Sequence, residues 1–189
     1  MKIAVFGGSF NPLHYGHLFI AEEARTELGY DRVIFVPSNI SSHKNDFSGL
    51  DPACRLEMLE EVLNNFDYLL LDSCDIERGG VSYSVDTIEH IYRKYSFTGK
   101  PGFIIGDDLT SGFTGWKNYQ ELKKMIDLIV VKRNFNKKID SGLPDYYIDN
   151  TILPLSSTEI RNRVKSGKTI KNLVPESVRL KIIKNGYYK

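Results

Sequence analysis

The feature that most constrains the fold of this chain is the alternation of short, continuous apolar runs with segments of helical spacing. The apolar runs lie at residues 3–6, 32–36, 68–71, 102–106 and 128–131. Strands that are apolar throughout, rather than at every second residue, are typical of a parallel sheet buried under helices on both faces. The sequence therefore predicts an α/β fold: a Rossmann-like doubly wound parallel sheet of about five or six strands, with a small helical C-terminus.

Turn and capping residues place the helices between these runs. Gly29-Tyr30 ends a first helix, and Asp51-Pro52 begins a second, with Asp as the N-cap and Pro at the first helical position. Further helices are expected near residues 85–95, 119–125, 158–165 and 175–184, and one more short strand within 146–155. Loops or irregular connections are expected at 38–50, 75–84, around Trp116 and at 134–145.

Length and composition fit one domain that spans residues 1–189. A chain of 189 residues, 41% of them hydrophobic, can bury a sizeable core. The 25 basic residues are balanced by 24 acidic ones, which argues against nucleic acid or a membrane as a partner.

No apolar stretch approaches a membrane span, and the chain begins with a strand rather than a secretory segment, so we expect a cytoplasmic protein. Cys54 and Cys74 fit no metal spacing and are expected to be reduced thiols. The oligomeric state is open, and a homo-oligomer is compatible with the sequence.

The charges are unevenly distributed along the chain. Residues 51–89 carry ten acidic and two basic side chains, and residues 161–189 carry nine basic side chains and one acidic. Two solvated helical faces of opposite sign explain this pattern. The alternative is that part of the basic segment faces an anionic ligand.

The loop after the first strand is the first candidate for chemistry, because ligands of parallel sheets bind outside the carboxyl ends of the strands. It contains Gly7, Gly8, Ser9 and Phe10, and it leads through an Asn-Pro turn to His14-Tyr15-Gly16-His17 at the start of the first helix. Unpaired N–H groups and the positive end of the helix dipole favour phosphate there. The sequence thus predicts nucleotide phosphate chemistry, with a plain glycine turn and two surface histidines as the alternative.

Two other readings of this loop are poor. A zinc site would need a third nearby ligand, and none accompanies the two histidines. A dinucleotide-dependent dehydrogenase would need G-x-G-x-x-G and an acidic residue after the second strand, where Val36-Pro37-Ser38 stands.

The second candidate is Ser156-Ser157-Thr158-Glu159-Ile160-Arg161. Ser156 and Glu159 have the spacing of a capping box, so an ordinary capped helix explains much of this stretch. The additional hydroxyls of Ser157 and Thr158, with Arg161 one turn later, would also suit phosphate oxygens.

Together these stretches resemble the paired motifs of the nucleotidyltransferases with an H-x-G-H motif. Within them, the chain is similar to the bacterial nicotinate-nucleotide adenylyltransferase family. The similarity extends over nearly the whole chain, through His43-Lys44, Ser82-Tyr83-Ser84-Val85-Asp86-Thr87, Gly106-x-Asp108 with Trp116, and Leu173-Val174-Pro175 with Tyr187-Tyr188. The departures from the family pattern are Ser84 for the frequent Thr, Ser41-Ser42 for prolines, and Lys117 for an aromatic residue.

The resemblance implies a reaction and its partners. The 5′-phosphate of nicotinate mononucleotide attacks the α-phosphorus of ATP, which releases pyrophosphate and forms nicotinate adenine dinucleotide in NAD biosynthesis. An ionised phosphate needs no general base, and positioning, electrostatics and Mg²⁺ bound with ATP would supply the catalysis. No side chain is predicted to be a metal ligand.

The resemblance also implies roles for individual residues. Catalysis falls to His14, His17 and Arg161, with His17 stabilising the transition state. ATP contacts are implied for Gly7, Gly8, Ser9, Phe10, His14, His17, Asp108, Ser156, Ser157, Thr158 and Arg161. Contacts to nicotinate mononucleotide are implied for Ser9, Lys44, Tyr83, Thr87, Trp116 and Arg133. Of these, Trp116 would stack on the pyridine ring, and Tyr83 and Thr87 would favour a carboxylate over an amide.

Three other functions remain open from the sequence. The nearest is nucleotidyl transfer to another acceptor: adenylyl transfer to nicotinamide mononucleotide or phosphopantetheine, or cytidylyl transfer to an alcohol phosphate. The second is a nucleotide-binding regulatory module without turnover, which the presence of His14, His17 and Arg161 disfavours. The third is the oxidoreductase that the first loop disfavours.

Overall fold

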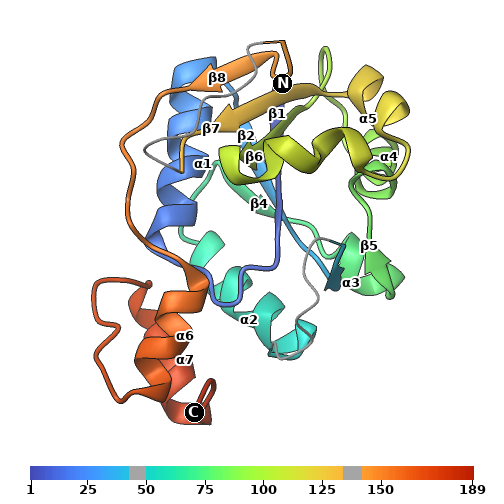
Figure 1. Cartoon of the computed structure of the whole chain (residues 1–189). Helices are drawn as coiled ribbons and strands as arrows, with labels where there is room; N and C mark the ends of the chain where they lie inside the picture. Colours follow the sequence, from blue (N-terminus) through green and yellow to red (C-terminus); the bar gives the residue numbers. More distant parts are fainter. Residues whose placement is uncertain (43–49, 134–141) are drawn as a thin grey trace.

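Six parallel strands form one sheet in the computed structural model, which describes residues 1–42, 50–133 and 142–189 (Figure 1). The strand order is β4-β2-β1-β6-β7-β8, and every neighbouring pair is parallel. The strands are β1 (Ile3–Gly8), β2 (Arg32–Pro37), β4 (Leu69–Leu71), β6 (Gly102–Gly106), β7 (Asp127–Val131) and β8 (Tyr146–Ile148). The order reverses between β1 and β6, so the predicted doubly wound Rossmann-like sheet is confirmed.

Seven α-helices and one 3₁₀ helix connect and cover the strands within the described residues. They are α1 (Tyr15–Leu28), α2 (Pro52–Leu63), α3 (Cys74–Arg78), α4 (Ser84–Lys94), η1 (Asp107–Gly115), α5 (Tyr119–Met125), α6 (Ser157–Lys165) and α7 (Glu176–Asn185). The predicted helix ends agree with the structure at two caps. The Asp51 carboxylate accepts a hydrogen bond from the Ala53 N–H at 2.8 Å, and Gly29 follows α1 in the left-handed conformation with φ 66°.

Two stretches expected to be irregular contain regular structure. The 38–50 connection contains β3 (Ile40–Ser41), and the 75–84 stretch contains most of α3 and β5 (Val81–Ser82). β3 and β5 pair in parallel as a separate two-stranded sheet. Two-residue strands carry too little periodicity to be seen in a sequence. The segment before Trp116 is η1 rather than an open loop.

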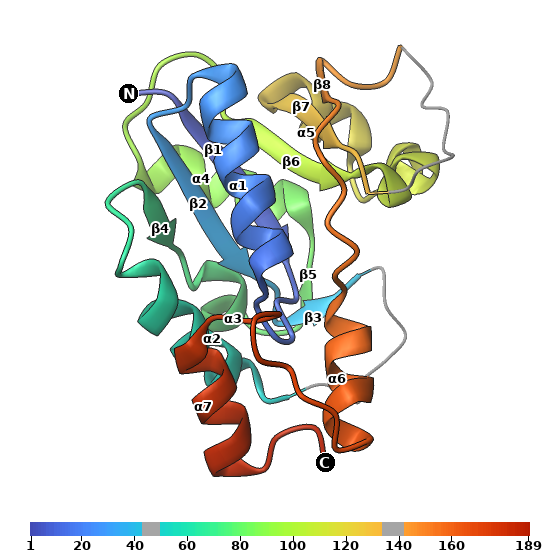
Figure 2. The same cartoon turned by 90° about the vertical axis from the view of Figure 1, so that its left-hand side faces the viewer.

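Each face of the six-stranded sheet has its own core, because successive residues of a strand point to opposite faces. Figure 2 shows α1 in front of the sheet and α4 behind it. The α1 face packs side chains from α2, α6 and α7 together with alternate strand residues, among them Ala4, Phe6, Ala21, Ala24, Met58, Leu59, Ile160 and Ile182. The other face packs α4 and α5 against the intervening strand residues, among them Ile3, Val5, Val85, Ile88, Phe103, Phe113 and Leu122.

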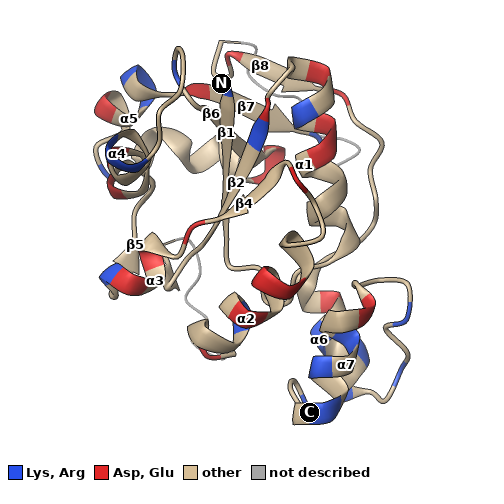
Figure 3. Cartoon of the chain, turned by 180° about the vertical axis from the view of Figure 1, so that it is seen from behind, with Lys and Arg blue, Asp and Glu red and all other residues tan. Residues whose placement is uncertain are grey.

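The acidic and basic segments of the sequence meet where α7 packs against α2. Figure 3 shows basic residues in α6 and α7 and acidic residues in α2. The Lys181 ammonium lies 3.4 Å from the carboxylates of both Glu57 and Glu61. Part of the basic segment is therefore explained by pairing with its acidic counterpart. Across the described ranges, none of the helices combines the length and apolar character that a membrane span needs.

Candidate active site

A cavity of about 530 Å³ opens at the carboxyl ends of the central strands. Its lining includes Gly7 and Gly8 at the end of β1, Gly106 at the end of β6 and Val131 at the end of β7. The cavity thus lies where the strand order reverses, as a doubly wound sheet predicts for a ligand site. The first turns of α1 and α6 both reach it.

The two histidines of the first motif form a stacked pair at the start of α1. Their ring centroids are 3.6 Å apart, and the Phe10 and His17 rings pack edge to face with centroids 5.0 Å apart. A Cβ at Gly16 would lie only 3.0 Å from two atoms of the His14 ring. The glycine in H-x-G-H is therefore needed for the His14 ring to lie against the helix.

His14 is the N-cap of α1, and the residue is only 3% exposed. Neither of its ring nitrogens has a hydrogen-bond partner among the described residues. Burial, and secondarily the charge of Arg133, lowers the pKa of His14 to about 3. The imidazole is therefore neutral near pH 7. A buried polar group without a partner costs free energy, so this ring is suited to a ligand that supplies one.

The backbone determines the tautomer of His17. Its Nδ1 accepts a hydrogen bond from the His14 N–H at 3.2 Å. An accepting Nδ1 cannot hold a proton, so the proton of this ring is on Nε2, which is then a donor. Both histidines line the cavity, and a neutral N–H donor beside a helix N-terminus can stabilise charge on a phosphate.

The hydroxyls of the second motif are partly used inside the protein. The Ser156 side chain caps α6 by accepting a hydrogen bond from the Glu159 N–H at 3.1 Å. This confirms the bond from the helix backbone to Ser156, which is one of the two bonds of the expected capping box. The Ser157 hydroxyl donates its only proton to the Pro12 carbonyl at 2.9 Å. Ser157 can therefore offer a phosphate its backbone N–H but not its hydroxyl proton. Thr158 differs, because its hydroxyl oxygen accepts from Arg161 and none of the described residues accepts its proton.

Arg161 is not part of the cavity lining. Its guanidinium donates to the Asn11 carbonyl at 2.8 Å and to the Thr158 hydroxyl at 3.2 Å. Asn11 follows Phe10 in the first loop, and it also accepts a hydrogen bond on Oδ1 from the Tyr188 hydroxyl at 2.7 Å. In this structure Arg161 connects the two motifs to each other instead of facing the cavity.

Asp108 and Arg133 form an ion pair at the carboxyl ends of β6 and β7. The guanidinium lies 3.2 Å from the Asp108 carboxylate, and both residues line the cavity. A Cβ at Gly106 would collide with the Asp108 carboxylate and would lie 2.5 Å from Arg133 Cδ. Both side chains therefore depend on the glycine in Gly106-x-Asp108. The neighbouring Asp107 is fully buried, in agreement with a structural rather than a ligand-binding role.

Two of the residues predicted for the pyridine pocket line the cavity, Trp116 and Thr87. Trp116 lines the cavity and packs edge-on against Phe113, with the ring centroids 4.7 Å apart. Thr87 also lines the cavity, but its hydroxyl lies 2.7 Å from the Asp75 carboxylate, to which it donates. The Thr87 hydroxyl proton is therefore not available to select a substrate carboxylate.

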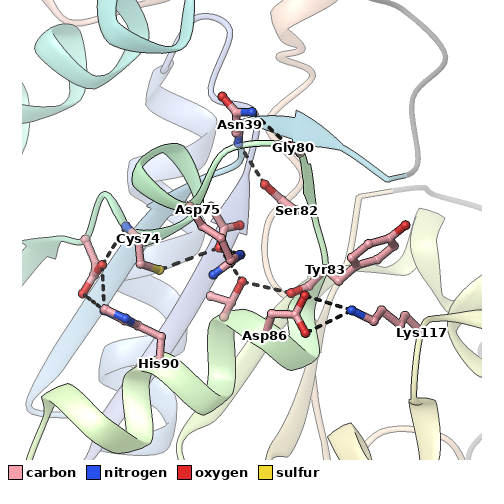
Figure 4. Close-up of polar contacts among 12 residues, drawn as sticks. Asn39, Cys74, Asp75, Gly80, Ser82, Tyr83, Asp86, His90 and Lys117 are labelled. Carbon is pink, nitrogen blue, oxygen red and sulfur yellow. Dashed lines mark hydrogen bonds and ion pairs between the residues drawn. The ribbon is translucent and has the colours of Figure 1, made fainter.

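Tyr83 lies outside the cavity lining, although its neighbours Ser82 and Ser84 both line the cavity. The Lys117 ammonium lies over the Tyr83 ring, 4.5 Å from its centroid, and pairs with Asp86 at 3.1 Å (Figure 4). The lysine that replaces a frequent aromatic residue thus holds Tyr83 against α4. Lys44 lies in 43–49, outside the described residues.

Comparisons with known proteins identify the family. The family model described as Cytidylyltransferase-like matches residues 5–163. A protein of Borreliella burgdorferi named "Probable nicotinate-nucleotide adenylyltransferase" is 42% identical over 98% of this chain and 95% of its own length. A protein of the same name from Desulfitobacterium hafniense is 35% identical over 100% of this chain and 96% of its own. The chain belongs to the nicotinate-nucleotide adenylyltransferase family.

Solved structures confirm the fold of this adenylyltransferase family member. Nicotinic acid mononucleotide adenylyltransferase of Plasmodium falciparum, complexed with NaAD, is similar with a TM-score of 0.77 and 22% identity, over 99% of this chain and 97% of that one. The same enzyme complexed with APC gives a TM-score of 0.75 at 20% identity, with coverages of 99% and 96%.

Several lining residues were missed by the sequence analysis. Asp75 lines the cavity beside Thr87 and forms an ion pair with Arg78 at 2.5 Å. Asn150 bridges β7 and the segment after β8, because its side-chain amide donates to the Lys132 carbonyl at 3.1 Å and accepts from the Lys132 N–H at 2.9 Å. Residues 150–155 then form a wall that leads to Ser156. The position of this segment directly before the second motif was the only signal in the sequence that could have indicated it.

One group of potential metal ligands lies away from the cavity lining. Asp72, Cys74 and His90 bring their ligand atoms within 4.8 Å of one another. The Asp72 carboxylate already accepts from the Tyr95 hydroxyl at 2.9 Å, and the Lys94 ammonium lies 3.1 Å from it. A lysine ammonium at this carboxylate opposes a second cation, so we interpret the group as a structural polar cluster.

Proposed function

We propose that this protein transfers the adenylyl group of ATP to nicotinate mononucleotide, forming nicotinate adenine dinucleotide and pyrophosphate in NAD biosynthesis. The observation that carries this proposal is that one cavity is lined both by the first turns of α1 and α6 and by Thr87 and Trp116. Transfer between ATP and a pyridine mononucleotide needs a site for the ATP phosphates and a surface on which the pyridine ring can pack.

The residues fit a transfer by positioning rather than by acid–base chemistry. An oxygen of the acceptor phosphate forms a bond to the α-phosphorus of ATP. At the same time, the bond breaks between the α-phosphorus and the oxygen that links it to the β-phosphate, and pyrophosphate leaves with that oxygen. No proton must be removed from the attacking oxygen, because a phosphate is ionised at neutral pH. The protein has to hold the two nucleotides in line and stabilise the negative charge that develops.

We assign the ATP side to the α1 and α6 N-termini. The Nε2–H of His17 and the neutral ring of His14 would donate to the α-phosphate, beside the backbone of Gly7, Gly8, Ser9 and Phe10. The first-turn N–H groups of α6 at Ser157 and Thr158, with the Thr158 hydroxyl, would bind the outer phosphates, and Ser156 would act as the cap that orients them. Arg161 would act from behind this group, and Asp108 would reach a ribose hydroxyl.

We assign the acceptor side to Trp116, Thr87, Arg133, Lys44 and Ser9. Trp116 would pack on the pyridine ring. The first turn of α4 offers backbone N–H groups to the pyridine carboxylate, because helix N-termini favour anions, and this replaces the hydroxyl contacts expected of Tyr83 and Thr87. Lys44 and Arg133 would contact the mononucleotide phosphate.

Mg²⁺ fits this site as an ion coordinated mainly by ATP rather than by protein side chains. Three carboxylates line the described part of the cavity, and two of them, Asp75 and Asp108, are paired with arginines. The third, Glu159, is exposed on the first turn of α6. A single exposed carboxylate is a poor Mg²⁺ site, so ATP phosphates and water would supply most ligands. Bound in this way, Mg²⁺ would neutralise charge on the departing pyrophosphate.

We also propose that residues 1–189 form a single nucleotidyltransferase domain that acts in the cytoplasm. Ile160, Val178 and Ile182 of the C-terminal helices belong to the same core cluster as the β1 residues Ala4 and Phe6. Both cysteines are free thiols, as expected in a reducing compartment.

The test is product formation by the purified protein with ATP, Mg²⁺ and each acceptor in turn. Nicotinate mononucleotide should give pyrophosphate and the dinucleotide in equal amounts, at a higher kcat/KM than nicotinamide mononucleotide. Preference for the nicotinamide form, or for phosphopantetheine, would overturn the acceptor assignment. Preference for CTP over ATP would overturn the donor. No release with any acceptor would favour a nucleotide-binding regulator.

Trp116→Ala tests the acceptor assignment separately. The loss of one aromatic contact of about 1–3 kcal/mol predicts an increase in KM for nicotinate mononucleotide of roughly fivefold to 150-fold, with KM for ATP within about twofold. Tyr119→Ala is the matched control, because Tyr119 also packs against Phe113 but does not line the cavity. An increase confined to the KM for ATP would assign Trp116 to the ATP side of the cavity and overturn its place on the acceptor side.

A further inference from the structure

Arg55 is a buried arginine whose hydrogen-bond partners among the described residues are all backbone carbonyls. Its guanidinium donates to Ser9 at 2.7 Å, to Ser38 at 2.8 Å, to Asn39 at 3.1 Å and to Leu50 at 3.2 Å, and the residue is only 4% exposed. No Asp or Glu among the described residues forms an ion pair with it. Burial lowers its pKa from the ordinary arginine range, and the nearby Tyr188 and Asp51 oppose this shift.

These contacts join three segments of the chain. Ser9 belongs to the loop at the ATP end, Ser38 and Asn39 follow β2, and Leu50 precedes α2. Ser9 and Ser38 both line the cavity, so the Arg55 guanidinium lies directly behind two residues of its wall.

Asn39 extends this connection to the acceptor end. Its backbone N–H donates to the Ser82 hydroxyl at 2.9 Å, and its side-chain amide donates to the Gly80 carbonyl at 2.9 Å (Figure 4). Ser82 lines the cavity and is the last residue of β5, two residues before α4 begins. A continuous path of hydrogen bonds therefore runs from Ser9 through Arg55 and Asn39 to Ser82.

We propose that Arg55 is a positioning residue that holds the ATP end and the acceptor end of the cavity in the mutual arrangement the transfer requires. The proposal rests on the adenylyl-transfer function proposed above. Arginine suits this task because its planar guanidinium presents five N–H donors in a fixed fork, which can reach carbonyls of several segments at once. A lysine ammonium would retain the charge but could not span the same carbonyls.

This role predicts a specific division between kcat and KM. Each end of the cavity retains its own ligand contacts when Arg55 is replaced, so each nucleotide should still bind. The relative placement of the two reacting groups should suffer, and a displacement of about 1 Å can cost on the order of a hundredfold in rate. We expect Arg55→Lys to lower kcat by roughly tenfold to a hundredfold, with both KM values within about threefold of wild type.

The experiment measures kcat, both KM values and the fraction of ATP-binding protein for wild type, Arg55→Lys, Arg55→Ala and Arg163→Lys. Arg163→Lys is the matched control, because Arg163 also donates to a backbone carbonyl, that of Thr169 at 2.9 Å, but does not line the cavity. Its kcat should stay within about twofold of wild type. Millimolar guanidinium should restore part of the kcat of Arg55→Ala, and urea, which is neutral and of similar shape, should not.

The outcomes separate this proposal from the proposed function. If wild type forms no dinucleotide, the function fails. If wild type is active, a normal kcat in folded Arg55→Lys overturns the positioning role alone. A loss confined to KM, or one that disappears when rates are expressed per ATP-binding molecule, also overturns it. Failure of both variants to fold would show that Arg55 is required only for structure.

Discussion

The two helix N-termini that face the cavity differ in what their side chains already do. At α1, both ring nitrogens of His14 lack partners among the described residues, and Nε2 of His17 is a donor. At α6, the Ser157 hydroxyl and the Arg161 guanidinium already hold the carbonyls of the first loop. The His14 ring at α1 is thus arranged for a ligand, whereas the side chains of α6 largely support the loop, and α6 offers mainly its backbone N–H groups.

Of the substitutions at these two helix N-termini, the replacement of His17 should lower kcat the most. His17→Ala removes a donor aimed at developing charge, which predicts a fall in kcat of roughly a hundredfold or more with the fold retained. Steady-state rates and thermal unfolding measure this. His90→Ala is the control, because His90 lies outside the cavity lining, and its kcat should be near wild type. Turnover near wild type in folded His17→Ala would remove His17 from the mechanism.

His14 should make folding sensitive to acid. Its pKa is about 3 in the folded protein and about 6.5 when unfolded, so the unfolded chain binds the extra proton as the pH falls. The contribution of the neutral His14 ring to the free energy of unfolding is complete above pH 6.5 and is lost as the pH falls toward 3. At pH 5 the loss is on the order of 2 kcal/mol.

Denaturant unfolding of wild type and His14→Gln between pH 7 and 5 measures this effect. The free energy of unfolding should fall less steeply in the variant, which has no group to protonate. Equal slopes would show that the His14 ring is not held neutral by its surroundings.

The sequence predicted the sheet because apolar runs and glycine turns are local signals. Gly29 and Asp51 were placed correctly for the same reason. The H-x-G-H motif likewise indicated the His14 and His17 cluster, since its four residues share one helix start. The use of the Ser157 hydroxyl by Pro12, 145 residues away, was not predictable, because no pattern within one segment encodes such a contact. Arg55 was missed for that reason also, and its carbonyl partners carry no side-chain signature.

Arg161→Lys tests whether α6 acts mainly by supporting the first loop. The lysine keeps the charge but loses the forked contact to Asn11 and Thr158, at a cost of about 1–2 kcal/mol. Because Arg161 acts through the loop, we expect kcat/KM for ATP to fall roughly tenfold, less than in His17→Ala. Arg179→Lys, which alters an exposed pair with Glu176, serves as the control. A loss as large as that of His17→Ala would mean that Arg161 turns toward the phosphates when ATP binds.

The smallest effect should come from Tyr188, which holds the same loop from the C-terminal end. Tyr188→Phe removes only the hydroxyl that donates to Asn11 Oδ1 at 2.7 Å. One such hydrogen bond contributes about 0.5–1.5 kcal/mol, so kcat/KM should fall about threefold. Tyr187→Phe is the neighbouring control and should stay near wild type. If Tyr188→Phe were unchanged, Arg55, Ser157 and Arg161 alone would suffice to hold the loop. A hundredfold loss would instead show that the loop is only marginally ordered, and that each of its carbonyl contacts is needed to present His14 and His17 to the nucleotide.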